Sequence, residues 1–159
     1  LLPKDVFFEG AGDLLGNHDV WFGGYRQRTD IRVYRMVGSL LGREILPVEL
    51  VDPRFYHLDT CFCPLTRGEV LWFPPAFDRY GQAAISDRFQ ESRRIAVPES
   101  EAVRFACNAV CVGKHVVLPE GCPGTMERLE SFGYTTHAVS LTEFLKAGGA
   151  AKCLTLALD

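Results

Sequence analysis

The fold of this protein is decided most clearly by residues 54–98, which read RFYHLDTCFCPLTRGEVLWFPPAFDRYGQAAISDRFQESRRIAVP. Two apolar runs in this stretch are separated by the turn-forming residues Thr66-Arg67-Gly68, and a segment with helical spacing of its apolar residues follows. The stretch therefore predicts a β-β-α-β module. Its expected elements are strands at 56–64 and 70–73, a helix near 80–92 and a strand at 95–97.

The same order of elements recurs on both sides of this stretch. Val20, Val70 and Val116 begin the expected second strands, at intervals of 50 and 46 residues. Because such units cannot bury their faces alone, we expect them to stack around a shared axis. The sequence thus predicts one α/β domain over 1–159, with modules at 5–52, 54–98 and 103–140 and a closing strand at 152–158. The flanking modules are expected to contain strand-forming runs at 6–8 and 20–22, helices at 29–41 and 125–132, and strands at 45–50, 105–112, 116–118 and 136–139.

Composition excludes several classes of protein. Of the 159 residues, 47% are hydrophobic and 23% charged, and the formal net charge is −3. These values are typical of a globular protein, and without a basic excess we expect no nucleic-acid partner. No apolar run approaches the roughly 20 residues that span a bilayer, so we expect no membrane partner. Six cysteines, several of them inside apolar runs, favour free thiols and a cytoplasmic location.

A histidine and an aspartate lie two residues apart in the middle module. If residues 56–64 form one strand, four side chains share one of its faces, namely His57, Asp59, Cys61 and Cys63. Burying His57 and Asp59 without partners is costly, so they indicate either a functional site or a hydrogen-bonded pair that only fixes the fold. A metal site on this face is a competing interpretation, although alternate side chains of one strand rarely all reach one ion.

The acidic segment Glu9-Gly10-Ala11-Gly12-Asp13 occupies the corresponding place in the first module. Glu9 precedes His57 by 48 residues, about one repeat, and equivalent positions of stacked modules converge on one axis. The small residues between the two carboxylates leave room for another group to approach closely. A polar turn between strands is the simpler alternative.

Cys153 follows a run of small residues, Gly148-Gly149-Ala150-Ala151, and is directly preceded by Lys152. In the expected final strand the leucines share one face and Cys153 points to the other. Lys152 would favour a thiolate, and His57 is the natural partner of a thiol nucleophile. A small buried cysteine is the simpler interpretation.

Four motifs together resemble those of the guanidino-group-modifying superfamily, which contains the arginine deiminases, the dimethylarginine dimethylaminohydrolases and the arginine amidinotransferases. The motifs are Phe8-Glu9-Gly10-Ala11-Gly12-Asp13, Gln27-Arg28-Thr29-Asp30, His57-Leu58-Asp59-Thr60 and Gly148-Gly149-Ala150-Ala151-Lys152-Cys153, in this order over nearly the whole chain. The resemblance implies the pentein fold, a five-bladed α/β propeller of repeated β-β-α-β modules around a central active site. About three of these modules are present here.

The resemblance also implies catalytic roles. Cys153 would be the nucleophile that attacks the guanidinium carbon. His57 would protonate the departing ammonia or amine and then activate the second nucleophile. Glu9 would sit beside His57 and the guanidinium.

Three further residues are substrate-binding candidates on the same grounds. Asp59 would hydrogen-bond the guanidinium nitrogens, and Arg28 would hold the substrate carboxylate. Asp13 closes the acidic motif, which is usually more compact in the family. The implied partner is a small guanidino compound, and the chemistry requires neither a metal nor an organic cofactor.

The resemblance therefore predicts a hydrolase that acts on the guanidinium group of arginine, or of a methylated or related derivative, through a covalent Cys-amidino intermediate. Amidino transfer to an amine, a non-catalytic metal-binding module and an inactive remnant are the alternatives. Family members carry about two further modules before the acidic motif, whereas this chain begins Leu1-Leu2-Pro3-Lys4 without an initiator Met. We expect a C-terminal portion of such an enzyme, with an exposed edge that favours homo-oligomers.

Overall fold

The computed structural model describes residues 3–16 and 20–156. Within these residues, nine strands form three separate three-stranded sheets. In every sheet the first two strands pair antiparallel, and the second pairs in parallel with the third. Since parallel neighbours need a crossover, a helix lies between the second and third strand of each unit. The predicted α/β class and its repeated β-β-α-β plan are confirmed.

Each module has its own set of elements. The first contains β1 (Leu14–Gly16), β2 (Trp21–Tyr25), α1 (Arg32–Leu41) and β3 (Ile45–Glu49). The second contains β4 (Phe62–Pro64), β5 (Val70–Trp72), α2 (Arg79–Arg88) and β6 (Arg94–Ala96). The third contains β7 (Val110–Val112), β8 (His115–Pro119), α4 (Pro123–Ser131) and β9 (Thr135–Val139). Two short helices that the sequence analysis did not predict, α3 (Glu99–Ala102) and α5 (Thr142–Lys146), flank the third module.

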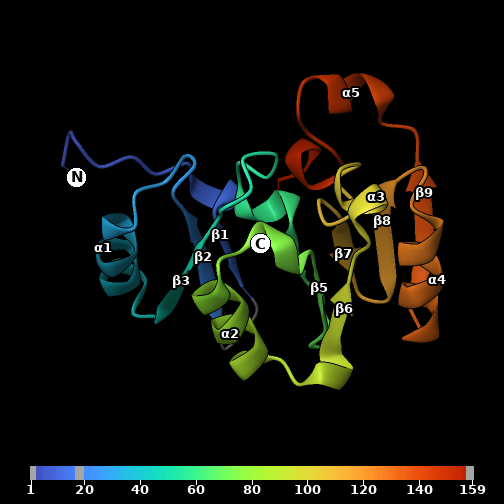
Figure 1. Cartoon of the computed structure of the whole chain (residues 1–159), viewed down its shortest axis with the longest axis horizontal. Helices are drawn as coiled ribbons and strands as arrows, with labels where there is room; N and C mark the ends of the chain where they lie inside the picture. The colour runs from blue at the N-terminus through green and yellow to red at the C-terminus, as the bar shows by residue number, and fades with distance from the viewer. Residues whose placement is uncertain (1–2, 17–19, 157–159) are drawn as a thin grey trace.

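The modules lie side by side along the molecule (Figure 1), with α1 at one end and α4 at the other. The chain after α5 returns toward the middle of the molecule. An aromatic cluster joins the first two modules, because the ring of Phe22 in β2 lies 5.0 Å from that of Phe62 and 5.9 Å from that of Phe89. A buried carboxylate joins the second and third, since Glu69 accepts a hydrogen bond of 2.6 Å from the Tyr134 hydroxyl.

In the second and third modules the first strand is shorter than the sequence predicted, and in the first module it lies at Leu14–Gly16 rather than at 6–8. Residues 57–61 form a 3₁₀ turn, η2 (Leu58–Thr60), rather than strand, because Thr60 donates both its backbone N–H and its hydroxyl to the carbonyl of His57. The prediction of a shared face is therefore wrong. Cys61 and Cys63 are buried in the hydrophobic core, whereas Asp59 belongs to the turn.

Two other expected strands differ in the same way. The runs at 6–8 and 105–109 are irregular or turn-forming, and pairing starts only at β1 and β7. The expected closing strand is also wrong, because Lys152–Leu154 form the 3₁₀ turn η5. The last part of that strand, residues 157–158, lies outside the described residues.

Two predictions of general character can be compared with the structure. All six cysteines are free thiols, as the sequence predicted. In the described part of the chain, no helix combines the length and the apolar character needed to cross a membrane.

Candidate active site

The site is assembled from the turns that precede the first strand of each module. Glu9 directly precedes the 3₁₀ turn η1 (Gly10–Gly12), and His57 directly precedes η2. Because β1 and β4 begin 48 residues apart, at Leu14 and Phe62, these two positions are structurally equivalent. The structure brings them together, with His57 Nε2 and Glu9 Oε2 separated by 2.6 Å.

A buried carboxylate fixes the geometry of this pair. Asp13 is fully buried, and its two oxygens accept hydrogen bonds from the Thr29 hydroxyl at 2.7 Å and from the Leu58 N–H at 2.9 Å. Thr29 also accepts the N–H of Glu9 at 3.2 Å. Both Asp13 oxygens are thus engaged within the protein, where they link Thr29 to the turn that follows His57.

A glycine leaves space for the His57 ring. A Cβ atom added at Gly12 would lie 2.7 Å from His57 Nδ1, closer than carbon and nitrogen can approach. The acidic motif therefore needs a residue without a side chain at this position.

The charges around Glu9 favour its ionised form. The hydrogen bond with His57 is the largest influence that holds the pKa of Glu9 below its usual value, and nearby Arg28 acts in the same direction. Arg28 Nη1 lies 3.6 Å from Glu9 Oε1, and its guanidinium lies 5.3 Å from the centre of the Tyr56 ring. Arg28 is half exposed and remains available to an anionic group.

Cys153 lies in η5, and its thiol faces the second module. Its Sγ lies 3.7 Å from Asp59 Oδ2 and 3.1 Å from Asn108 Nδ2. Burial raises the pKa of the Cys153 thiol, and the negative charge of Asp59 raises it further. The positive charge of Lys152 lowers the pKa of the neighbouring Asp59, although burial raises that pKa by more.

Asp59 is the most constrained carboxylate of the site. It is 5% exposed, and its Oδ1 atom accepts no hydrogen bond from the described residues. Burial raises its pKa to about 6. A cavity of about 160 Å³ lies beside it and is also lined by Lys152. His57 and Cys153 do not line this cavity. A buried carboxylate oxygen without a partner is suited to a cationic, hydrogen-bond-donating ligand.

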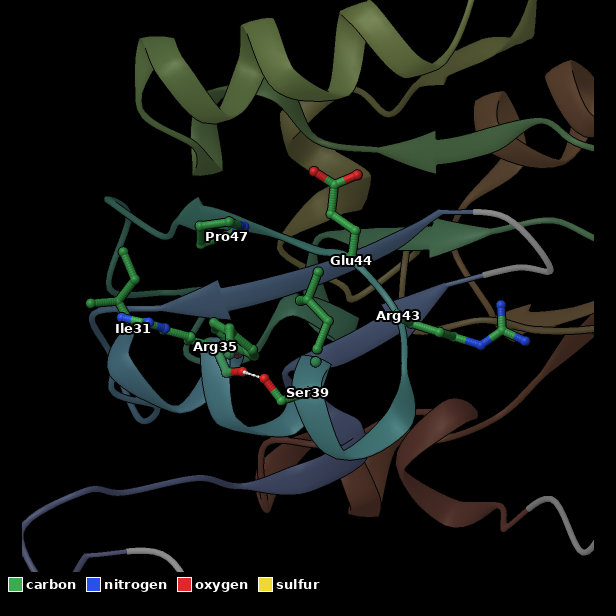
Figure 2. A pocket seen from close by; sticks show the side chains of 9 residues that line it. Ile31, Arg35, Ser39, Arg43, Glu44 and Pro47 are labelled. Atoms are coloured by element: carbon green, nitrogen blue, oxygen red, sulfur yellow. Dashed lines mark hydrogen bonds between the residues drawn. The ribbon is translucent and has the colours of Figure 1, made fainter.

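Other features of the described residues do not compete with this site. No group of three or more histidine, cysteine, aspartate or glutamate side chains in that part of the chain could hold a metal ion, so the proposed ligand set of His57, Asp59, Cys61 and Cys63 is wrong. A hollow of about 480 Å³ lies between α1 and β3 (Figure 2), where Arg35 and Glu44 are among its lining residues. None of the predicted site residues lines it.

Three residues of the site were not assigned a role by the sequence analysis. Thr29 links Glu9 to Asp13, Tyr56 packs its ring 4.8 Å from that of His57, and Asn108 contacts Cys153. Asn108 did carry a signal, because it is a single amide within the apolar run at 105–110. A buried polar residue in such a run requires partners.

Known proteins are similar to this chain over most of its length. No protein-family model matches the chain. The bifunctional arginine dihydrolase/ornithine cyclodeaminase AgrE of Nostoc sp. is 46% identical over 157 residues, which make up 98% of this chain and 22% of AgrE. The N(G),N(G)-dimethylarginine dimethylaminohydrolase of Mycobacterium tuberculosis is 40% identical over 148 residues, 93% of this chain and 48% of that enzyme.

A solved structure supports the same relationship. It is the N-terminal domain of ArgZ, from Synechocystis sp., covalently bound to a reaction intermediate. The two folds agree with a TM-score of 0.96 at 44% identity, over 99% of this chain and 59% of that one.

The repeated modules, with a thiol, an imidazole and carboxylates gathered where their turns meet, define a pentein-type α/β protein. The chain belongs to the guanidino-group-modifying superfamily. It spans about a fifth of the length of AgrE and about half of the mycobacterial enzyme.

Proposed function

We propose that the protein hydrolyses the guanidinium group of arginine, or of a methylated or closely related derivative, through a covalent intermediate on Cys153. The observation that carries the proposal is the position of the Cys153 thiol, 3.7 Å from a buried carboxylate whose Oδ1 atom accepts no hydrogen bond from the described residues. The names of the relatives, arginine dihydrolase and dimethylarginine dimethylaminohydrolase, support the substrate class. The ArgZ structure with its covalently bound intermediate supports the type of reaction.

Substrate binding prepares the nucleophile in this proposal. A guanidinium that donates hydrogen bonds to Asp59 neutralises the charge that, together with burial, raises the pKa of Cys153. The thiol is therefore easier to ionise once the substrate is bound. Arg28 lies at the more exposed end of the site and binds the substrate carboxylate.

The first half of the reaction transfers the amidino group to sulfur. The Cys153 thiol gives its proton to His57, and the thiolate attacks the guanidinium carbon to form a C–S bond. One C–N bond then breaks, and His57 returns the proton to the leaving nitrogen, which departs as ammonia or an amine. Glu9, 2.6 Å from His57 Nε2, stabilises the protonated imidazole.

The second half releases the product. Neutral His57 accepts a proton from a water molecule, whose oxygen adds to the amidino carbon. The C–S bond breaks, the thiolate is restored, and the carbon leaves as a ureido product. Water as the acceptor makes the reaction a hydrolysis, whereas an amine at this step would make it amidino transfer.

A trapping experiment tests the proposal. The 159-residue chain and the complete gene product are each incubated with a reactive amidine, and the modified peptide is identified by mass spectrometry. We expect one adduct, on Cys153, because the other thiols are buried or lie away from Asp59. Cys111, which is only partly buried, is the internal control. No adduct, or an adduct on another cysteine, would refute the covalent mechanism.

Two wider features belong to the same proposal. Six free thiols support a reducing compartment, the cytoplasm, as the place of action. Exposed apolar side chains near the end of α1, such as Leu40 and Leu41, support self-association. Sedimentation of the wild type and of Leu40→Gln tests the second point, because a monomeric wild type would contradict it.

A further inference from the structure

The third module also contributes its turn to the site. Its first strand, β7, begins at Val110, which is 48 residues after β4 begins at Phe62 and 96 after β1 begins at Leu14. Asn108 therefore occupies, two residues before β7, the place that Thr60 and Gly12 occupy before β4 and β1. The turn that corresponds to those of Glu9 and His57 thus carries Asn108, which lies beside Cys153 and Asp59.

The hydrogen bonds of the Asn108 carboxamide fix its orientation. The side chain is fully buried, and its oxygen accepts the N–H groups of Ala150 at 3.1 Å and of Cys153 at 3.2 Å. Two donors on one side require the oxygen to face them, so the NH₂ group must face the other way. There it donates to Cys153 Sγ at 3.1 Å and to the carbonyl of Asp59 at 3.2 Å.

The backbone around Asn108 is held in place as well. Its N–H donates to the carbonyl of Phe105 at 2.9 Å, and its carbonyl accepts the N–H of Lys152 at 3.1 Å. Phe105 has a φ of 60°, a left-handed conformation that is uncommon for a bulky residue and persists where the surroundings impose it. Its ring packs edge-on against Tyr56, at 6.4 Å between centres. The turn is therefore built to present Asn108 in one position.

We propose that Asn108 is a further catalytic residue, whose carboxamide holds the Cys153 sulfur beside Asp59 and donates a hydrogen bond to the thiolate. The inference rests on the proposed function in one respect, that Cys153 is the nucleophile. An N–H donor stabilises the charged form of the sulfur, and it opposes the carboxylate charge on the other side of the same atom. The Asn108 carboxamide also links three parts of the chain. Asn108 belongs to the third module, and its side chain contacts both the Asp59 turn and the Cys153 segment.

The variant Asn108→Asp tests this assignment, because it retains the acceptor oxygen and replaces the donor by a second oxygen. The rate of iodoacetamide alkylation at Cys153 is measured against pH by peptide mass spectrometry, without substrate. We expect the inflection to rise by at least about one pH unit, which means about tenfold less thiolate near neutral pH. Alkylation of Cys111 in the same sample should change less than about twofold, since the Cys111 sulfur contacts Thr66 and the Gly113 carbonyl rather than the Asn108 carboxamide.

The matched control is Gln82→Glu, the same amide-to-carboxylate change in α2, where Gln82 donates to the carbonyl of Phe77. It should leave the Cys153 profile unchanged. A folded Asn108→Asp protein with a wild-type Cys153 profile would overturn the proposal.

A measurement on the wild type covers the case in which the variant does not fold. The sequence contains only two asparagines, Asn17 and Asn108. Labelling with ¹⁵N-asparagine therefore gives two pairs of side-chain NH₂ signals, one pair for each residue. We expect one of them to shift with pH at the inflection found for Cys153 alkylation, and to lose that response in Cys153→Ser. A signal pair that does not respond refutes the hydrogen bond. Neither readout involves turnover, so each stands or fails independently of the proposed reaction.

Discussion

The two halves of the site treat charge in opposite ways. In the half formed by Glu9 and His57, the Glu9 side chain is 41% exposed and its pKa lies below the usual value, mainly because His57 hydrogen-bonds it. In the half formed by Cys153 and Asp59, burial raises both pKa values. The first half favours an ionised carboxylate, whereas the second resists negative charge. The difference supports the proposed cationic substrate.

The nucleophile half should be the more sensitive to mutation. Cys153→Ser replaces the thiol by an alcohol of far weaker nucleophilicity at neutral pH, so we expect turnover to fall by at least about 10³-fold. Steady-state assays together with a thermal melt measure it, and the melt should be close to that of the wild type. Cys111→Ser is the control, with near-normal activity. Turnover that persists in Cys153→Ser would show that the Cys153 thiol is not the nucleophile.

A substitution at Asp59 is the most direct test of the difference in charge between the two halves of the site. Asp59→Asn removes the charge proposed to bind the guanidinium, and we expect kcat/KM to fall by about 10²- to 10³-fold. The conservative Asp59→Glu should recover little, because the longer side chain does not fit beside Cys153 in the buried turn. Steady-state kinetics with arginine and its methylated derivatives measure both variants. Unchanged kcat/KM in Asp59→Asn would show that this half does not bind the cation.

Asp59→Asn should also be more stable toward unfolding than the wild type above pH 6. The folded protein holds the Asp59 proton with a pKa of about 6, above the usual value of 3.8, so the wild type loses stability as the pH rises from about 4 to about 6. The full cost above that range is on the order of 3 kcal/mol. Urea unfolding at pH 4 and pH 7.5 measures it, and the advantage of Asp59→Asn should appear only at pH 7.5. An equal difference at both pH values would contradict the raised pKa.

The other half is tested by Glu9→Gln, which keeps a hydrogen-bond acceptor for His57 but removes the charge. We expect kcat to fall by about 10²-fold, because the imidazolium loses its counter-charge in both proton transfers. The alkylation profile of Cys153 should shift less than in Asn108→Asp, because Asn108 contacts the Cys153 sulfur whereas Glu9 contacts His57. Glu91→Gln, at an exposed position in the second module, is the matched control. An equally large shift of the Cys153 alkylation profile in Glu9→Gln would show that the two halves of the site are electrostatically coupled.

The smallest effect is expected from the glycine beside His57. Gly12→Ala places a methyl group 2.7 Å from His57 Nδ1, so the ring must move and kcat should fall by about tenfold. Gly10→Ala provides the contrast, because its Cβ meets no atom within 4 Å while its φ of +63° strains an alanine. Thermal melts and kinetics of both variants should show lower kcat in the first and lower stability in the second. Equal kcat values would mean that Gly12 does not control the ring.

Sequence patterns succeeded where a feature repeats over many residues. The interval of 48 residues between Glu9 and His57 correctly placed them in equivalent turns, because each module folds in the same order. The strand expected at 56–64 was wrong, because a hydrogen-bonded turn replaces its first half. The reason given for Cys153 failed in the same manner, since η5 takes the place of the expected strand. In both cases local polar contacts outweighed an apolar pattern that also fits a strand.

The sequence by itself determined the repeated β-β-α-β order, the free cysteines and the residues of the acidic and histidine motifs. These follow from hydrophobic periodicity and from residue chemistry, which act over short distances along the chain. Only the tertiary structure decided that Asp13 is buried and satisfied, that Asp59 keeps a free oxygen, and that Asn108 reaches Cys153. Those contacts join segments 16 to 45 residues apart, and burial and hydrogen-bond geometry across such distances depend on how the modules pack.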